Sequence, residues 1–276
     1  MRLLQALLYR EITILKKRFP EIITLWIFSI LFGLFVIYGP SVLLNTSVEH
    51  VVDRLSMLFG KKLSLEDALT LMFTLSAVIS MTTMTMSDFA QQIVDDKFSG
   101  AIDHVLLSTT LVRYYISYAI ALSIVTTPVA TIYLVPLLYL VKGLGGVLIY
   151  AYLLPVFLLS CILLSLYASS IIVPLAYLTK IQRLWILPSI IVPMLLAGSG
   201  VFIPLTIVPL FLKLLAYTSP LPETCTILQD MLLRAAGKLA LPLTLLTMLM
   251  VLYVLLYSGT AKIAEARART QGAALT

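Results

Sequence analysis

The sequence predicts an all-α integral membrane protein with six transmembrane helices. Hydrophobic residues make up 61% of the 276 residues and charged residues only 12%, whereas soluble domains contain about 45–50% apolar and about 25% charged residues. The bilayer is therefore the expected solvent. A helix needs about 20 apolar residues to cross its hydrocarbon core. We expect one six-span transmembrane domain over residues 21–260, with crossings at about 22–44, 68–94, 114–141, 147–178, 184–201 and 239–258.

Residues 1–20 precede the first predicted crossing and have the pattern of an amphipathic helix. Arg2, Lys16 and Lys17 fall mostly outside an apolar stripe along one side. Such a helix suits the headgroup plane of the membrane, and Pro20 permits a turn into the first crossing. The alternative is a long extension of that crossing. The stripe consists of Leu4, Leu8, Ile12, Leu15 and Phe19.

The distribution of basic residues predicts the orientation. Six crossings place both termini on the same side of the membrane. Lys and Arg are more frequent in the segments on that side, beginning with the N-terminal segment, and basic segments favour the cytoplasm. We therefore expect a plasma-membrane protein with cytoplasmic termini. Residues 95–113 would form a cytoplasmic loop and residues 261–276 a cytoplasmic tail.

The first cytoplasmic loop begins with a polar run, "DDKFSGAIDHVLLST", from Asp95 to Thr109. Its spacing predicts a short helix from Ala101 to about Leu107, with Ser99 as a candidate N-cap. Ile102, Val105 and Leu106 would then lie on one side of that helix. An apolar helix face of this kind docks into grooves on soluble partners. The alternative is an ordinary solvated loop.

The second crossing is the most polar one. Ser76, Ser80, Thr83 and Ser87 recur on one helical face, and Asp88 follows them. This face is a candidate wall of a transport path. The alternative is helix packing through small hydroxyl side chains. Because a buried Asp is costly in lipid, we expect Asp88 near the cytoplasmic interface.

Residues 202–217 are apolar, but Pro204 and Pro209 interrupt them. Proline removes a backbone donor and disfavours helix in the residue before it. We therefore expect a re-entrant element on the extracellular side in place of a seventh crossing. Irregular backbone at membrane depth is tolerated where protein or a water-filled cavity covers it.

Several functional classes lack their motifs. The net charge is +6, but no basic stripe is interleaved with aromatics, so nucleic acid is not an expected partner. No C-x-x-C, H-E-x-x-H or G-x-S-x-G motif is present, so no metal site and no catalytic residues are predicted. Neither Gly60-Lys61 nor Gly237-Lys238 belongs to a phosphate-binding loop. We expect no directly bound cofactor.

Two stretches resemble the permease subunits of type-2 ABC exporters. "DKFSGAIDHVLLST", Asp96 to Thr109, is similar to the first cytoplasmic loop of that family, although Ala101 and Thr109 replace its usual Thr and Pro. "GSGVFIPLTIVPLFLKLLAYTSPL", Gly198 to Leu221, is similar to its re-entrant segment, although Ser219 replaces the usual Asn. The two motifs cover about forty residues and occur in the family's order.

The resemblance implies a coupling role for the loop. Its helix would sit in a cleft of a separate ABC ATPase, which would hold ATP and Mg, and residues 1–20 would form the connecting helix beside it. A homodimer or a heterodimer with a second six-span permease is also implied. The implied coupling residues are Asp95, Asp96, Lys97, Gly100, Ile102, Asp103, Val105 and Leu106.

The same resemblance assigns the re-entrant element to an extracellular gate. The residues concerned are Gly200, Phe202, Pro204, Pro209, Tyr217 and Pro220. The apolar crossings favour an amphipathic or hydrophobic substrate, and the resemblance to exporters implies that it would be moved outward. Two other functions remain open: an ion-coupled secondary transporter or channel, for which Asp88 is the nearest candidate, and a membrane scaffold for a soluble partner.

Overall fold

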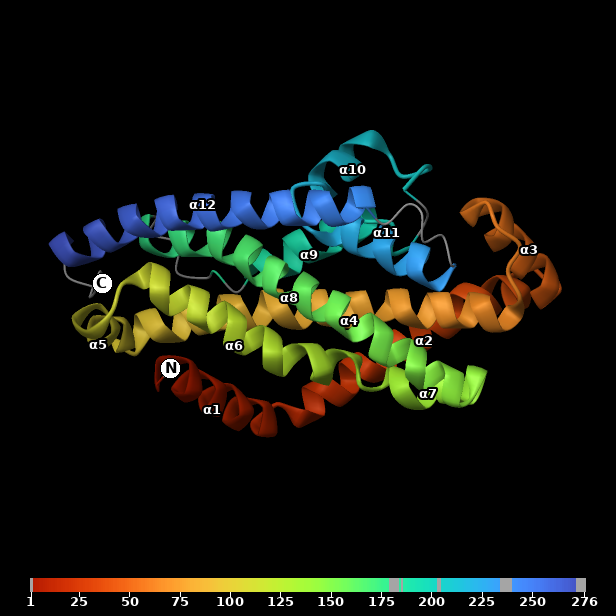
Figure 1. The fold of residues 1–276 in the computed structure, drawn as a ribbon, viewed down its shortest axis with the longest axis horizontal. Helices are drawn as coiled ribbons and strands as arrows, with labels where there is room; N and C mark the ends of the chain where they lie inside the picture. Colours follow the sequence, from red (N-terminus) through yellow and green to blue (C-terminus); the bar gives the residue numbers. More distant parts are fainter. Residues whose placement is uncertain (1, 179–183, 185, 203–204, 234–239, 272–276) are drawn as a thin grey trace.

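The computed structural model describes residues 2–178, 184, 186–202, 205–233 and 240–271, and this part of the chain is helical without strands (Figure 1). The helices are α1 (Arg2–Lys17), α2 (Phe19–Leu43), α3 (Val48–Phe59), α4 (Leu65–Phe98), α5 (Ala101–Ser108), α6 (Leu111–Thr131), α7 (Leu134–Lys142), α8 (Leu144–Leu178), α9 (Ile186–Gly198), α10 (Leu210–Ala216), α11 (Leu221–Leu232) and α12 (Ala240–Gln271).

Five helices in the described ranges are long and apolar enough to cross a membrane: α2, α4, α6, α8 and α12. This supports the prediction of an all-α membrane protein. The predicted crossing at 184–201 corresponds to α9, whose 13 residues are fewer than the roughly 20 that a crossing needs. Residues 179–183 and 185, which precede α9, lie outside the described part.

One predicted crossing is interrupted. The crossing at 114–141 is divided into α6 and α7, with a turn between Thr131 and Leu134. Pro136 explains the break, because its ring would clash with the carbonyl of Ile132 in a continuous helix. Helix α12 runs without interruption from Ala240 to Gln271, so residues 261–271 continue the helix of the sixth predicted crossing.

The amphipathic segment is a helix of its own, α1, and not the start of α2. Pro20 lies in the first turn of α2. A helix continuing from α1 would bring the ring of Pro20 against the carbonyl of Lys16. The chain therefore turns at Arg18, and α1 packs along α6 as well as meeting α2.

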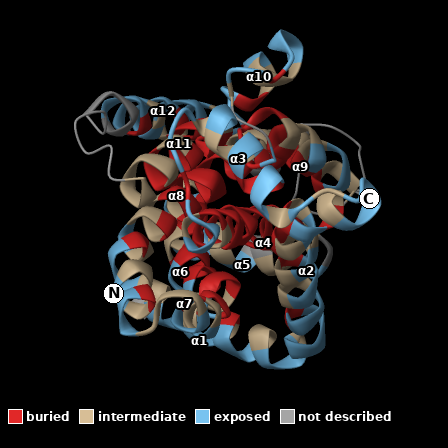
Figure 2. Cartoon of the chain, turned by 90° about the vertical axis from the view of Figure 1, so that its right-hand side faces the viewer, coloured by how far each residue is buried: buried red, intermediate tan, exposed pale blue. Residues whose placement is uncertain are grey.

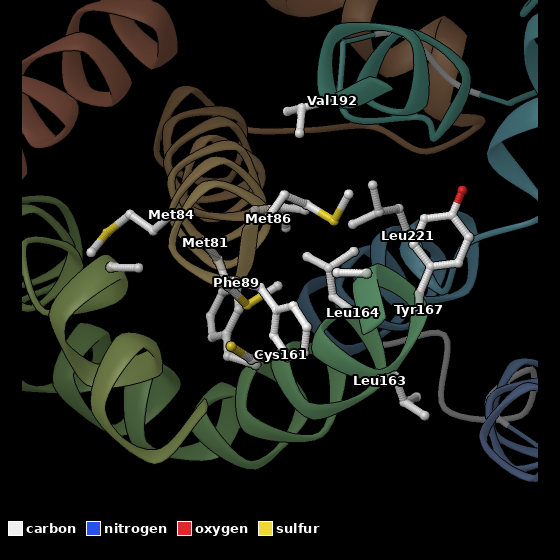
Figure 3. Close-up of a cluster of buried hydrophobic side chains, with 14 of the residues drawn as sticks. Met81, Met84, Met86, Phe89, Cys161, Leu163, Leu164, Tyr167, Val192 and Leu221 are labelled. Carbon is white, nitrogen blue, oxygen red and sulfur yellow. The ribbon is translucent and has the colours of Figure 1, made fainter. Parts of the chain in front are cut away.

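The most polar crossing, α4, lies at the centre of the bundle. In its most apolar 18-residue window 89% of the residues are buried, compared with 22% in α2 and in α12. Figure 2 shows α4 as a mainly buried helix surrounded by the others. Helix α4 therefore contributes hydroxyl-bearing residues and methionines to the core. Figure 3 shows the interface with α8, where Met81, Met86 and Phe89 approach Cys161 and Leu164.

The two ends of the bundle are different. The start of α1, helix α5 and the end of α12 lie together at one end, which we call the α5 end. Helices α3 and α7 lie at the opposite end, called the α3 end (Figure 1). Charged side chains at each of these two ends form the sites described below.

Candidate functional site

Helix α5 is a short segment that projects at the end of the bundle. Gly100 precedes it with φ 71°, a left-handed conformation that favours glycine. The predicted helix from Ala101 is confirmed, but its N-cap is Gly100 and not Ser99. Thr110 caps the next helix by accepting a hydrogen bond from the Arg113 amide at 3.3 Å. A glycine turn and a Thr cap therefore define both ends of α5.

The exposed surface of α5 differs from the expected one. Val105 and Leu106 are half-buried against the hydrophobic core of the protein itself. Leu107 is 87% exposed, and His104 is exposed as well. The side chains of Ile102 and Asp103 lie outside the described part. Within that part, His104, Leu107 and Ser108 are the exposed side chains that α5 offers to a partner.

Directly before α5, Asp96 joins three helices. Its carboxylate is almost fully buried, and it accepts hydrogen bonds from Tyr114 on α6 at 3.0 Å and from Gln92 at 2.5 Å. Arg10 on α1 lies 3.4 Å from the same carboxylate and donates to the Tyr114 hydroxyl at 3.2 Å. The Arg10 guanidinium also lies 5.4 Å from the ring centroid of Tyr118. We call Arg10, Gln92, Asp96, Tyr114 and Tyr118 the Asp96 network.

Lys97 connects α4 to α8 through a hydrogen bond. Its ammonium group donates to the carbonyl oxygen of Ala176 at 2.7 Å, in the last turn of α8, where carbonyl groups have no partner within the helix. Beside it the hydroxyls of Tyr115 and Tyr177 lie 3.1 Å apart and join α6 to α8. Asp96 and Lys97 thus make their polar contacts inside the chain. Asp95 is exposed and accepts from Gln91 at 2.8 Å.

Helix α12 also makes polar contacts next to α5, at the start of α6. The Tyr257 hydroxyl donates to the Leu111 carbonyl at 3.0 Å, and the Glu265 carboxylate accepts from the Leu111 amide at 3.0 Å. Leu111 is the first residue of α6 and follows α5 after two residues. Helices α1, α4, α6, α8 and α12 are therefore all joined by polar contacts close to the two ends of α5.

A second acidic group lies about two turns earlier along α4. Asp88 forms an ion pair with Arg18 in the turn between α1 and α2, and Arg18 also contacts Glu21 at 2.7 Å. Glu11 is 5% exposed and lies 3.7 Å from the guanidinium of Arg10, but its Oε1 atom has no hydrogen-bond partner among the described residues. Burial, with a smaller contribution from Asp88, raises the pKa of Glu11 to about 7 against the opposing effect of Arg10.

These acids line a polar cavity of about 420 Å³ between α1 and α4. Glu11, Glu21, Asp88 and Asp95 contribute carboxylates to it, and Arg18 contributes a positive charge. Sequence reasoning found Asp88 but missed Arg10, Glu11 and Arg18. The sequence signal for Glu11 was that it is the single acid within a basic amphipathic helix. Composition alone does not show whether such an acid is buried or solvated.

The other candidate path residues have packing contacts. Ser76 donates to the Phe73 carbonyl at 2.8 Å and lies 3.3 Å from the Tyr133 hydroxyl. Ser80 pairs with Ser29 of α2. Both are fully buried, whereas Thr83 and Ser87 are half-buried. Ser76 and Ser80 thus join α4 to its neighbours in the arrangement described here.

The predicted re-entrant range, residues 202–217, contains the short helix α10, which pairs with α9, the helix of the predicted fifth crossing. A Cβ atom at Gly198 would lie 2.1 Å from the Leu212 carbonyl oxygen, so the two helices approach as closely as glycine allows. Gly200 has φ 87°, and the rings of Phe202 and Phe32 lie 5.2 Å apart. Pro204 lies outside the described residues.

The remaining gate candidates border the short helices of this region. Pro209 precedes α10, Tyr217 follows it, and Pro220 precedes α11. Helix α10 projects from the bundle (Figure 1), and exposed apolar residues such as Leu210 and Phe211 cover it. The pair therefore presents an apolar surface on the side of the bundle.

In the described part of the chain, no group of three or more His, Cys, Asp or Glu side chains is placed to hold a metal ion. Comparisons of the chain with family models, with curated proteins and with solved structures find no match.

Proposed function

We propose that this chain is the permease subunit of an ATP-driven ABC exporter, moving an amphipathic or hydrophobic substrate outward with a separate ATPase subunit. One observation carries the proposal. An exposed short helix, α5, is attached on both sides to a junction that joins α1, α4, α6, α8 and α12. The resemblance of the α5 sequence to the coupling loop of type-2 exporters supports the same conclusion.

The polar contacts around α5 connect it to five other helices, as mechanical coupling to the membrane domain requires. A force on α5 acts on the end of α4 at Lys97 and on the start of α6 at Leu111. The Asp96 network transmits it to α1, Lys97 transmits it to α8, and Tyr257 transmits it to α12. Packed and hydrogen-bonded elements move as units instead of deforming gradually. ATP and Mg would be bound by the partner, and this chain would respond through α5.

A second permease chain would complete the transporter. The most apolar windows of α2 and α12 are only 22% buried within the chain. Their exposed faces are available to lipid and to another copy of this chain or a paralogue. We propose alternating access, or a lateral path, between two such halves in the plasma membrane, with both termini in the cytoplasm.

The test is co-purification from native membranes in mild detergent. The chain should retain an ATPase that contains a phosphate-binding loop. The variant Leu107→Lys should lose it, because Leu107 is exposed on α5 and is not needed for folding. Met57→Lys is the matched control, since Met57 is 80% exposed at the α3 end. Retention of the ATPase by Leu107→Lys, or its absence from the wild type, would contradict the proposal.

The cavity lined by Glu11 and Asp88 favours a second candidate, an ion-coupled transporter. A buried carboxylate with an elevated pKa is a common component of proton pathways. The two candidates differ in their energy source. Reconstituted vesicles that hold this chain without an ATPase should show no substrate flux under a pH gradient. Flux that Glu11→Gln abolishes would favour the second candidate.

A further inference from the structure

A cavity of about 430 Å³ opens at the α3 end, on the opposite side of the molecule from α5. Residues of five regions line it: the connection between α3 and α4, the first turn of α4, the end of α7, the N-terminal part of α8 and the end of α11. Basic side chains and apolar side chains occupy different parts of its wall. None of the residues discussed above for coupling or for the gate belongs to it.

The charged part of the wall is positive. Lys61, Lys62 and Lys142 line the cavity together with a single acid, Asp67. Both oxygens of that acid are engaged, one by Lys142 at 2.5 Å and the other by the Ser64 hydroxyl at 2.9 Å. In the described part of the chain Lys61 and Lys62 form no ion pair. Two cations thus face the cavity without internal compensation.

The backbone holds these lysines in place. Gly60 ends α3 with φ 66°, which turns the chain toward α4. Ser56 then fixes the connection from both sides, because its carbonyl accepts from the Lys61 amide and its hydroxyl accepts from the Leu63 amide, each at 2.9 Å. The segment between these two bonds carries Lys61 and Lys62. A ligand would meet a basic loop that is already ordered, which lowers the entropic cost of binding.

The rest of the wall is apolar. Ile149, Leu153 and Leu232 line it, and Tyr152 is 63% exposed at its edge. Tyr and Lys side chains are typical of the zone where a membrane meets water. A ligand bound here would place an anionic group on the lysines and an apolar group along α8.

We propose that this cavity binds an anionic amphiphile through its phosphate group, with a phospholipid of the surrounding membrane as the occupant. Basic pockets between transmembrane helices recognise anionic headgroups in this way. The proposal does not depend on the exporter function, because it concerns the α3 end alone.

Native mass spectrometry of the purified full chain tests this proposal. The probes are phosphatidylglycerol, phosphatidylcholine and glycerol phosphate, each added to the delipidated protein. We expect phosphatidylglycerol to be retained in preference to phosphatidylcholine. Removing both free cations in Lys61→Gln/Lys62→Gln should reduce that retention by roughly tenfold or more, given the usual contribution of a Lys close to an anionic headgroup.

Two further variants serve as controls. Lys61→Arg/Lys62→Arg keeps both charges and should keep the preference. Lys16→Gln/Lys17→Gln removes an exposed Lys pair at the α5 side of the molecule and should leave the preference unchanged. Equal retention of the two lipids, or no loss in Lys61→Gln/Lys62→Gln, would overturn the proposal. Glycerol phosphate binding as strongly as phosphatidylglycerol would overturn the lipid as the occupant.

Discussion

At the scale of single residues, the polar groups of the α5 end show how this chain places charge next to a membrane. Asp96 is buried with Arg10, Tyr114 and Gln92 around its carboxylate. The side chain of Asp88 is 14% exposed and pairs with Arg18. A buried charge needs both an opposite charge and hydrogen bonds to offset its desolvation. Glu11 has an opposite charge nearby, but its Oε1 atom has no hydrogen-bond partner among the described residues, so its protonation affects stability.

Glu11 makes the stability of the protein depend on pH. Its pKa of about 7 in the folded protein exceeds the ordinary value of 4.5, mainly because of burial. The folded state then holds the proton more tightly than the unfolded state, so its stability falls as the pH rises from about 4.5 to about 7. Above that range the ionised Glu11 costs no more than about 3 kcal/mol.

Glu11→Gln removes this titration. The variant should therefore exceed the wild type in thermal unfolding midpoint at pH 8, and the difference should shrink as the pH falls toward 4.5. Unfolding in mild detergent, followed by circular dichroism at several pH values, measures it. Glu49→Gln, at an exposed position on α3, is the control. A pH-independent difference for Glu11→Gln would show that Glu11 does not titrate as inferred.

At the scale of elements, close approach decides where helices lie. Helices α7 and α8 form a tight hairpin in which a Cβ atom at Gly146 would lie 2.0 Å from the Leu138 carbonyl oxygen. Backbone cannot yield as a flexible side chain can, so α7 has to move if that position gains a methyl group. The neighbouring Gly145 has nothing within 4 Å of its Cβ position.

Two adjacent glycines thus provide a matched pair of substitutions. Gly146→Ala should destabilise the protein by about 1–3 kcal/mol through overpacking, whereas Gly145→Ala should be neutral or stabilising by up to about 1 kcal/mol because alanine favours helix. The unfolding midpoints of the two variants test this. Gly146→Ala should also weaken retention of phosphatidylglycerol, since displacing α7 moves Lys142. Equal midpoints would contradict the close α7–α8 packing.

At the scale of the whole molecule, local sequence patterns predicted the positions of individual helices. They did not predict contacts between residues that lie far apart in the sequence. The spacing of the apolar residues located α5 to within a residue, although the cap is Gly100 and not Ser99. Periodicity alone missed the break at Ile132, which depends on the ring of Pro136 four residues later. It also missed Arg10 as the partner of Asp96, because 86 residues separate them. The central position of α4 was equally hidden, since its hydroxyl side chains find partners only after the bundle forms.

The arrangement of the whole chain also makes orientation measurable. Leu107 on α5 and Met57 on α3 lie at opposite ends of the bundle (Figure 1), and both are at least 80% exposed. The native cysteines Cys161 and Cys225 are fully buried, and burial raises the pKa of Cys225 to about 12. A thiol reacts as its thiolate, so neither should compete with an introduced exposed cysteine.

Single variants Met57→Cys and Leu107→Cys should therefore behave oppositely in intact cells. A membrane-impermeant maleimide should label Met57→Cys from outside, and Leu107→Cys only after permeabilisation, because the basic segments predict a cytoplasmic α5 end. The unsubstituted chain is the control for background labelling. The reverse pattern would place α5 outside the cell, where no ATP-hydrolysing partner could drive it, and the exporter proposal would fail together with the orientation.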